Sequence, residues 1–250
     1  MIVREVMTTR LVTITPDDTL SRAVSLFRQH QFHHLPVVRA ARKQAGTPGI
    51  ERRTRDSLPI LAGLLTSNDI DLAAAGDTES SSDILRRPWQ KRRVAEVMQR
   101  ATMRVTPTTS VAAAAQILVE RGLNCVPVVE YDDAEPTGEP AEPETRTLLA
   151  GLLTRSDLLL ALARALGAYE PGMDLTVELS GADLAPLAGL LLMAQDLHIQ
   201  VRSILAAPLE GSVPRVATVR LGTINPAPLL VRLHEAGIQY TFADPLVDGR

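Results

Sequence analysis

Short apolar runs separated by turn-forming residues dominate the first 165 residues of the chain. Uninterrupted apolar segments of strand length predict buried strands at Leu35–Val38, Ile60–Leu65, Val126–Val129 and Leu148–Leu153. Shorter strand candidates that end at a Thr-Pro pair are Leu11–Ile14 and Thr102–Val105. Capping residues predict helices at about 19–30 and 110–121, and further helices are expected to begin at Thr66 and Thr154. The order strand, helix, strand, strand, helix therefore occurs twice.

Four blocks of sequence recur in the same order, which indicates an internal repeat. Three of them recur at an offset of 91: Val3–Met7 as Val94–Met98, Thr15-Pro16 as Thr106-Pro107, and Leu35–Val38 as Val126–Val129. The fourth, Leu61–Asp69, recurs as Leu149–Asp157 at an offset of 88. The change of offset lies between Val38 and Leu61, so this segment is predicted to be a loop of variable length.

The remaining third of the chain has no counterpart in the repeat. Strands are expected at Leu175–Leu179, Ile199–Leu205, Arg215–Leu221 and Ile238–Phe242, and helices at Asp183–Leu197 and Pro226–Ala236. The order strand-helix-strand-strand-helix-strand is that of ferredoxin-like domains.

The repeated run Gly-hydrophobic-hydrophobic-Thr-x-x-Asp, beside a hydrophobic-Pro-Val-Val strand, resembles a tandem pair of CBS domains, the Bateman module. The resemblance implies CBS domain 1 at residues 1–75, a linker at 76–93 and CBS domain 2 at 94–165. Residues 174–246 resemble an ACT-like domain by element order, as in acetoin-utilisation type regulatory proteins. The expected fold class is α/β, a CBS-domain pair followed by a ferredoxin-like (ACT-like) α+β domain.

The pairs Thr66/Asp69 and Thr154/Asp157 have two interpretations. A threonine followed three residues later by an acid is the spacing of a capping box at a helix start. The same geometry suits a nucleotide, because a helix N-terminus favours phosphate and a carboxylate can accept hydrogen bonds from ribose hydroxyls.

The resemblance implies sites that mix the two repeats. One site would join Thr154, Arg155 and Asp157 to Val12, Thr13, Ile14, Thr15, His33, His34 and Leu35. The other would join Thr66 and Asp69 to Met103, Thr106, Asn124, Cys125 and Val126. The first is favoured because Arg155 could form charge-assisted bonds to phosphate. The ligand class implied is an adenine nucleotide (AMP, ADP or ATP) or a related adenosyl compound.

Composition and sequence patterns argue against several other classes of protein and site. A net charge of −3 and an aromatic content of 3% argue against a nucleic-acid binder, and a single cysteine excludes an internal disulfide. The apolar runs are too short for a membrane span, and the N-terminal sequence Met-Ile-Val-Arg-Glu does not show the basic-then-apolar pattern of a signal peptide, so a cytoplasmic location is expected. His30, His33 and His34 suggest a metal site only if one helix carries all three, and the predicted helix end near Gln31 argues against that.

The sequence contains no recognisable catalytic motif, so a non-catalytic regulatory sensor with no required cofactor is the leading hypothesis. A CBS pair that serves only as a structural or dimerisation module is the alternative. An enzyme with a CBS appendage is a third class, disfavoured because about 80 residues remain for a catalytic domain. A homodimer and a regulated target enzyme are the expected protein partners.

Overall fold

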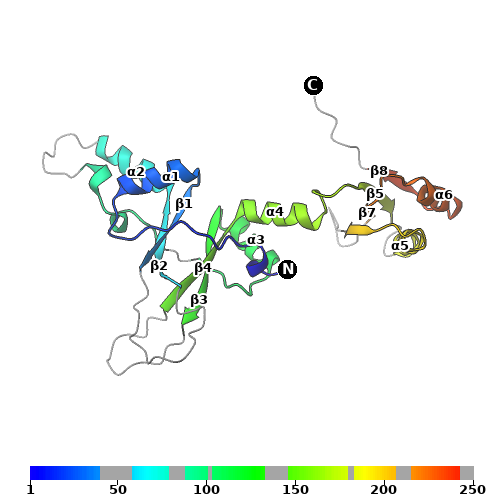
Figure 1. The fold of residues 1–250 in the computed structure, drawn as a ribbon, viewed down its shortest axis with the longest axis horizontal. Helices are drawn as coiled ribbons and strands as arrows, with labels where there is room; N and C mark the ends of the chain where they lie inside the picture. The colour runs from blue at the N-terminus through cyan, green and yellow to red at the C-terminus, as the bar shows by residue number, and fades with distance from the viewer. Residues whose placement is uncertain are drawn as a thin grey trace. The chain divides into compact units, whose positions relative to one another are not determined.

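The computed structural model describes residues 1–39, 58–78, 88–100, 103–132, 146–179, 183–206 and 215–242 (Figure 1). The chain divides into two compact units, Met1–Leu158 and Leu159–Arg250. Within the described part of the chain, no helix is both long enough and apolar enough to cross a membrane.

The described part of the first unit contains a four-stranded antiparallel sheet in the order β1-β2-β4-β3. Its strands are β1 (His34–Arg39), β2 (Ile60–Thr66), β3 (Cys125–Asp132) and β4 (Arg146–Thr154). Its helices are α1 (Leu20–His30), α2 (Ser67–Thr78) and α3 (Val111–Glu120), and α4 (Arg155–Ala165) follows β4. Each repeat contributes one hairpin, and the pairing of Ile60 with Leu148 joins the hairpins into one sheet.

These bounds agree closely with the prediction for the apolar runs and the capped helices. The expected strand Leu11–Ile14 is wrong in extent, because Ile14 alone forms a bridge there, to Val37. Pro16 lacks an N–H group and the chain turns at Thr15, so the ladder cannot continue. Val105 forms the equivalent single bridge to Val128, while Thr102 lies outside the described residues.

Each repeat is completed by a short arm from the other repeat. The first arm, residues 1–10, begins the first repeat and contains the 3₁₀ turn η1 (Val3–Glu5). The second arm, residues 92–100, begins the second repeat and contains η4 (Val94–Glu96). Val3 is fully buried in the core of the second repeat, and Val94 is fully buried in the core of the first. The two arms therefore exchange places across the pair.

The arms pair with the strands that precede the Thr-x-x-Asp motifs. Thr8 exchanges two backbone hydrogen bonds of 2.9 Å with Leu152 in β4, and Gln99 does the same with Leu64 in β2. The Trp89–Lys91 turn (η3) precedes the second arm, and Trp89 packs partly buried against the first core.

The second unit has the predicted element order. Its elements are β5 (Met173–Glu178), α5 (Ala185–Asp196), β6 (Val201–Leu205), β7 (Val216–Leu221), α6 (Ala227–Glu235) and β8 (Tyr240–Phe242). The described strands form an antiparallel sheet in the order β6-β7-β5-β8. Alternate residues of β5 and β7, such as Leu175 and Val219, enter a core with Leu190 of α5 and Leu229 of α6.

Gly151 and Gly63 allow the arms to lie against their strands. A Cβ atom at Gly151 would come within 2.9 Å of the Thr8 carbonyl oxygen, and one at Gly63 within 2.6 Å of the Gln99 carbonyl oxygen. We expect Gly63→Ala and Gly151→Ala each to lower the free energy of unfolding by about 1–3 kcal/mol, since backbone must move to relieve the contact.

The matched control is Gly76→Ala in α2, where an added Cβ would meet no atom within 4 Å. This variant should be as stable as the wild type or more stable by roughly 0.5–1 kcal/mol, as expected for glycine replaced inside a helix. Chemical denaturation followed by circular dichroism measures all three. Wild-type stability of Gly151→Ala would contradict the arm position.

Candidate functional site

The two Thr-x-x-Asp motifs form the same hydrogen-bonded loop at the starts of α2 and α4. In each, the threonine N–H and hydroxyl donate to Oδ2 of the aspartate, at 2.8 and 2.7 Å. The aspartate N–H in turn donates to the threonine hydroxyl oxygen, at 3.2 Å in the first repeat and 3.1 Å in the second. The hydrogen bonds of a capped helix start are therefore present in both repeats. They leave Oδ1 of each aspartate for other partners.

Residues of the exchanged arms donate hydrogen bonds to these Oδ1 atoms. The Thr8 hydroxyl donates to Oδ1 of Asp157 at 3.2 Å, and the Gln99 amide donates to Oδ1 of Asp69 at 2.5 Å. Asp69 is 5% exposed, whereas Asp157 is only partly buried. The two carboxylates therefore differ in how far solvent can reach them.

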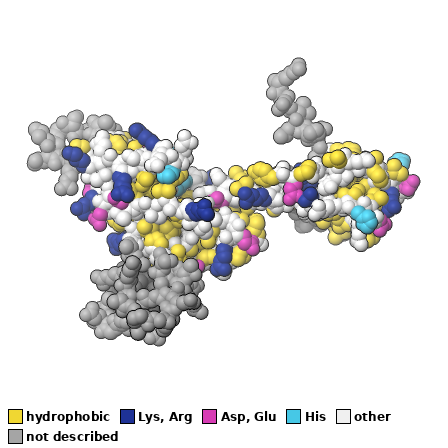
Figure 2. Space-filling view, in the orientation of Figure 1, with side chains coloured by type: hydrophobic (Ala, Val, Ile, Leu, Met, Phe, Trp, Pro, Cys, Tyr) yellow, Lys and Arg dark blue, Asp and Glu magenta, His cyan; other side chains and the backbone are white. Residues whose placement is uncertain are grey.

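Asp157 lines a cavity of about 350 Å³ in the first unit. The lining comes from the first arm, the end of α1, β1, β4 and the start of α4. Its residues are Thr8, Arg10, Leu11, Val12, His30, Phe32, His34, Pro36, Leu152, Thr154 and Asp157. Figure 2 shows histidine and arginine side chains among hydrophobic ones on the visible face of this unit.

Four residues expected at the first site line this cavity: Thr154, Asp157, Val12 and His34. Ile14 and Leu35 are buried in the core of the first repeat. Thr13 is partly buried and is not among the lining residues.

The other expected residues of this site are held elsewhere. The Thr15 hydroxyl donates to Asp18 at 2.8 Å, and Nδ1 of His33 lies 3.3 Å from the Ser67 hydroxyl. The Arg155 guanidinium donates to two carbonyl oxygens at the end of α3, Leu123 at 2.8 Å and Leu118 at 3.3 Å. Arg155 thus satisfies helix carbonyls and is not among the residues that line the cavity.

Of the residues expected at the second site, Asp69 lines a cavity of about 260 Å³ between α2 and the second arm, and the others are not among its lining residues. Val126 is fully buried, and the Thr106 hydroxyl lies 3.0 Å from that of Thr109. The Asn124 carbonyl accepts from the Arg155 N–H at 3.1 Å. Met103 packs partly buried against the core of the second repeat.

Cys125 is buried at the start of β3, and no disulfide involves it. Burial, followed by the charge of Asp157, raises the pKa of its thiol to about 12. The thiol is therefore neutral at physiological pH, in keeping with a packed side chain and not a nucleophile.

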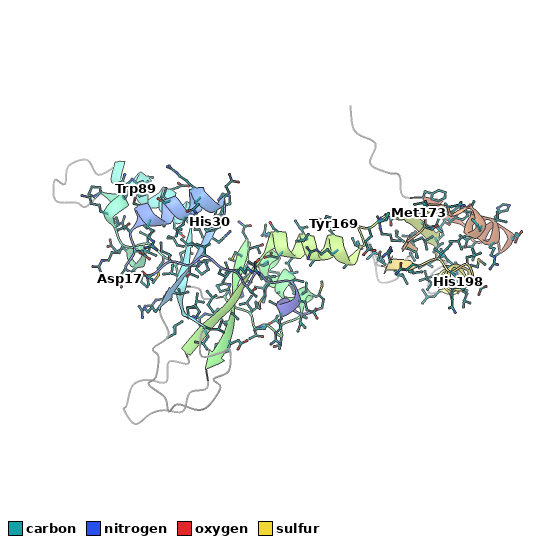
Figure 3. All side chains as sticks on the ribbon, viewed as in Figure 1. Asp17, His30, Trp89, Tyr169, Met173 and His198 are labelled. Carbon is teal, nitrogen blue, oxygen red and sulfur yellow. The ribbon has the colours of Figure 1, made fainter. Side chains whose placement is uncertain are left out.

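Three histidines lie near the end of α1 without forming a ligand cluster. His30, labelled in Figure 3, is the last residue of α1. Its ring stacks on that of Phe32, with centroids 5.3 Å apart. Gln31, in the left-handed region at φ 53°, ends the helix as expected. Among the residues that the structure describes, no group of three or more His, Cys, Asp or Glu side chains is placed to hold a metal ion.

The sequence did not identify Arg10, Thr8 or Phe32 as site residues. Thr8 directly follows the repeated Val-x-Glu-Val-Met block, which could have drawn attention to it. Arg10 stands where the second repeat has Ala101, so the repeat gave no signal for it.

A model of the family described as CBS domain matches the chain twice, over residues 3–46 and 94–139. The two matches begin 91 residues apart, the offset of the internal repeat. The chain contains a tandem pair of CBS domains. The CBS domain-containing protein YhcV of Bacillus subtilis (strain 168) is 24% identical over 131 residues, which are 52% of this chain and 74% of YhcV.

Solved CBS structures are also similar. A protein from Vibrio cholerae assigned to acetoin utilization (AcuB) is 24% identical, with a TM-score of 0.46 over 68% of this chain and 98% of that one. CBSX2, solved in complex with AMP, is 19% identical, with a TM-score of 0.43 over 65% of this chain and 96% of that one.

His34, in the cavity of the CBS pair, makes folding sensitive to acid. Burial lowers its pKa below the ordinary value, and the charge of His33 adds to this, while Asp69 opposes it. Because the folded chain holds this proton less readily than the unfolded chain, the effect is absent above about pH 6.5 and destabilises the fold below it.

We therefore expect the free energy of unfolding to fall less steeply between about pH 7.5 and about pH 5 in His34→Gln than in the wild type. Urea unfolding at several pH values, without added nucleotide, measures the two slopes. Equal slopes would mean that other groups govern acid sensitivity.

Proposed function

We propose that the CBS pair is a non-catalytic regulatory sensor that binds an adenine nucleotide or related adenosyl compound in the Asp157 cavity. The observation that carries the proposal is that a carboxylate at a helix start, an exposed arginine and a partly apolar wall meet in one cavity. Its volume of about 350 Å³ falls in the range of about 300–1,000 Å³ typical of small-molecule sites.

The polar groups suit the two polar parts of such a ligand. Oδ2 of Asp157 is used by Thr154, but Oδ1 accepts only the Thr8 hydroxyl among the described contacts and can accept from a ribose hydroxyl. Arg10 is exposed at the cavity and can donate to phosphate oxygens, and the positive end of α4 adds to the attraction. Arg10 takes the phosphate role expected of Arg155.

The apolar wall suits a planar base. Leu11, Val12, Pro36 and Leu152 line the cavity, and the stacked pair His30–Phe32 adds an aromatic surface. Offset stacking on such a ring, together with apolar burial, stabilises a purine without hydrogen-bond selection.

The C-terminal part belongs to the same proposal, as an ACT-like domain at residues 174–246 that responds to the nucleotide state together with a target enzyme. Support for the ferredoxin-like assignment is the described sheet order β6-β7-β5-β8, antiparallel throughout, with α5 and α6 in the two crossovers. A cytoplasmic location stays a prediction from the sequence.

AMP should raise the melting temperature of the protein. A ligand at about 100 times its Kd stabilises the folded state by about 2.7 kcal/mol, which corresponds to roughly 5–10 °C for a chain of this size. Differential scanning fluorimetry with AMP, ADP and ATP measures this. No shift with any adenosyl compound at millimolar concentration would favour the alternative, a CBS pair with a purely structural role.

Thr154→Ala and Thr66→Ala form a matched pair that separates capping from binding. Both remove the same cap and should lower the free energy of unfolding by about 0.5–2 kcal/mol without ligand. Thr154→Ala should also weaken AMP binding, because Thr154 holds Asp157 at the cavity, whereas Thr66→Ala should spare the affinity. Calorimetric titration measures both, and equal loss of affinity would place the ligand elsewhere.

We expect the chain to be a homodimer. Large apolar side chains are exposed on described helices of the first unit, among them Leu72 of α2 at 64% and Val119 of α3 at 72%. Burying such residues between copies removes apolar area from water. Sedimentation equilibrium should give twice the 27.0 kDa chain mass at micromolar concentration, and a single-chain mass would contradict the expectation.

A further inference from the structure

The two Asp sites of the CBS pair share one backbone arrangement. Thr8 and Gln99 occupy equivalent positions, 91 residues apart, and each pairs by two 2.9 Å backbone bonds with the leucine two residues before the motif threonine. Each faces Oδ1 of the motif aspartate, Asp157 or Asp69. The sites can therefore be compared side chain by side chain.

The arm residue decides whether the carboxylate is available. At Asp69 the Gln99 amide donates to Oδ1 at 2.5 Å, a charge-assisted bond, while Thr66 holds Oδ2. Both oxygens are thus engaged, and the residue is 5% exposed.

At Asp157 the arm offers a small hydroxyl at 3.2 Å. This hydroxyl can rotate away from Oδ1 and accept a bond from a ligand instead, whereas an amide nitrogen cannot accept. Asp157 also lines the 350 Å³ cavity. The carboxylate can therefore exchange the Thr8 bond for a ligand bond.

The surrounding charges differ in the same direction. The exposed Arg10 of the Asp157 cavity corresponds to Ala101, which lies outside the described residues. Asp69 lines a smaller cavity of about 260 Å³, whose one arginine, Arg92, forms an ion pair of 3.5 Å with Glu96 of the same lining. An anionic ligand is thus attracted more strongly to the Asp157 side.

We infer that the CBS pair binds one adenosyl ligand per chain, at Asp157, because the Gln99 side chain occupies the Asp69 carboxylate oxygen that a ligand would need. Gln99 is then the residue that makes two similar repeats bind unequally. The inference rests on the proposed function, since it concerns the number and place of its ligands.

Exchange of the two arm residues tests this, with AMP as the probe in isothermal titration calorimetry. The wild type should bind one AMP per chain. Gln99→Thr, which copies Thr8, should add a second and weaker site, so that two AMP bind per chain. Thr8→Gln, which copies Gln99, should weaken binding at Asp157 at least tenfold.

Both substitutions are at exposed positions, and circular dichroism with thermal melting verifies folding. Thr9→Gln, the same change one residue further along the exposed arm and outside the cavity lining, is the control and should keep wild-type affinity. Asp157→Ala in the Gln99→Thr background should remove one of the two sites, which locates the new site at Asp69.

The possible outcomes test the single-site inference separately from the proposed sensor function. Two AMP per wild-type chain would overturn the single-site inference and leave the sensor function standing. A single AMP per chain in folded Gln99→Thr would overturn the role of Gln99. No AMP bound to the wild type would overturn the nucleotide-sensor function and the single site with it.

Discussion

The exchange of arms between the two repeats is the contact on which the rest of the CBS pair depends. Each arm inserts a buried valine, Val3 or Val94, into the core of the other repeat. Each arm also pairs with a strand of that repeat, and its backbone lies against a glycine of the strand. At Gly63 and Gly151 a side chain would overlap the arm backbone, so only glycine admits the arm at this distance. Neither core is complete without the other repeat.

This exchange also determines the chemistry of each site. Since an arm runs along the strand that precedes the motif helix, the residue after Met7 or Met98 faces the carboxylate of the other repeat. The motif supplies the cap and the carboxylate. Residues outside the motif, such as Arg10 and His34, supply the charge and shape that distinguish one site from the other.

The elements could be predicted from the sequence because local patterns produce them: continuous apolar runs gave the strands to within one residue for β1 and β2, and caps gave α1 and α3. The site was predictable only in part. Arg155 bonds carbonyls at the end of α3, a tertiary contact that no local pattern encodes. Arg10 has no counterpart in the repeat, and Ile14 stops pairing after one bridge because the chain turns toward Pro16.

Repetition of the Thr-x-x-Asp motif does not imply repetition of ligand binding. The reciprocal bonds between threonine and aspartate stabilise the helix start in both repeats, so the motif has a structural reason to occur twice. A ligand at Asp69 must displace a partly buried, charge-assisted amide bond, whose loss leaves polar groups to satisfy again. A ligand at Asp157 displaces a longer bond from a hydroxyl that can turn to meet it. In the single-site proposal, the arm residue contributed by the opposite repeat, Thr8 or Gln99, therefore decides whether the motif aspartate can exchange a partner for a ligand.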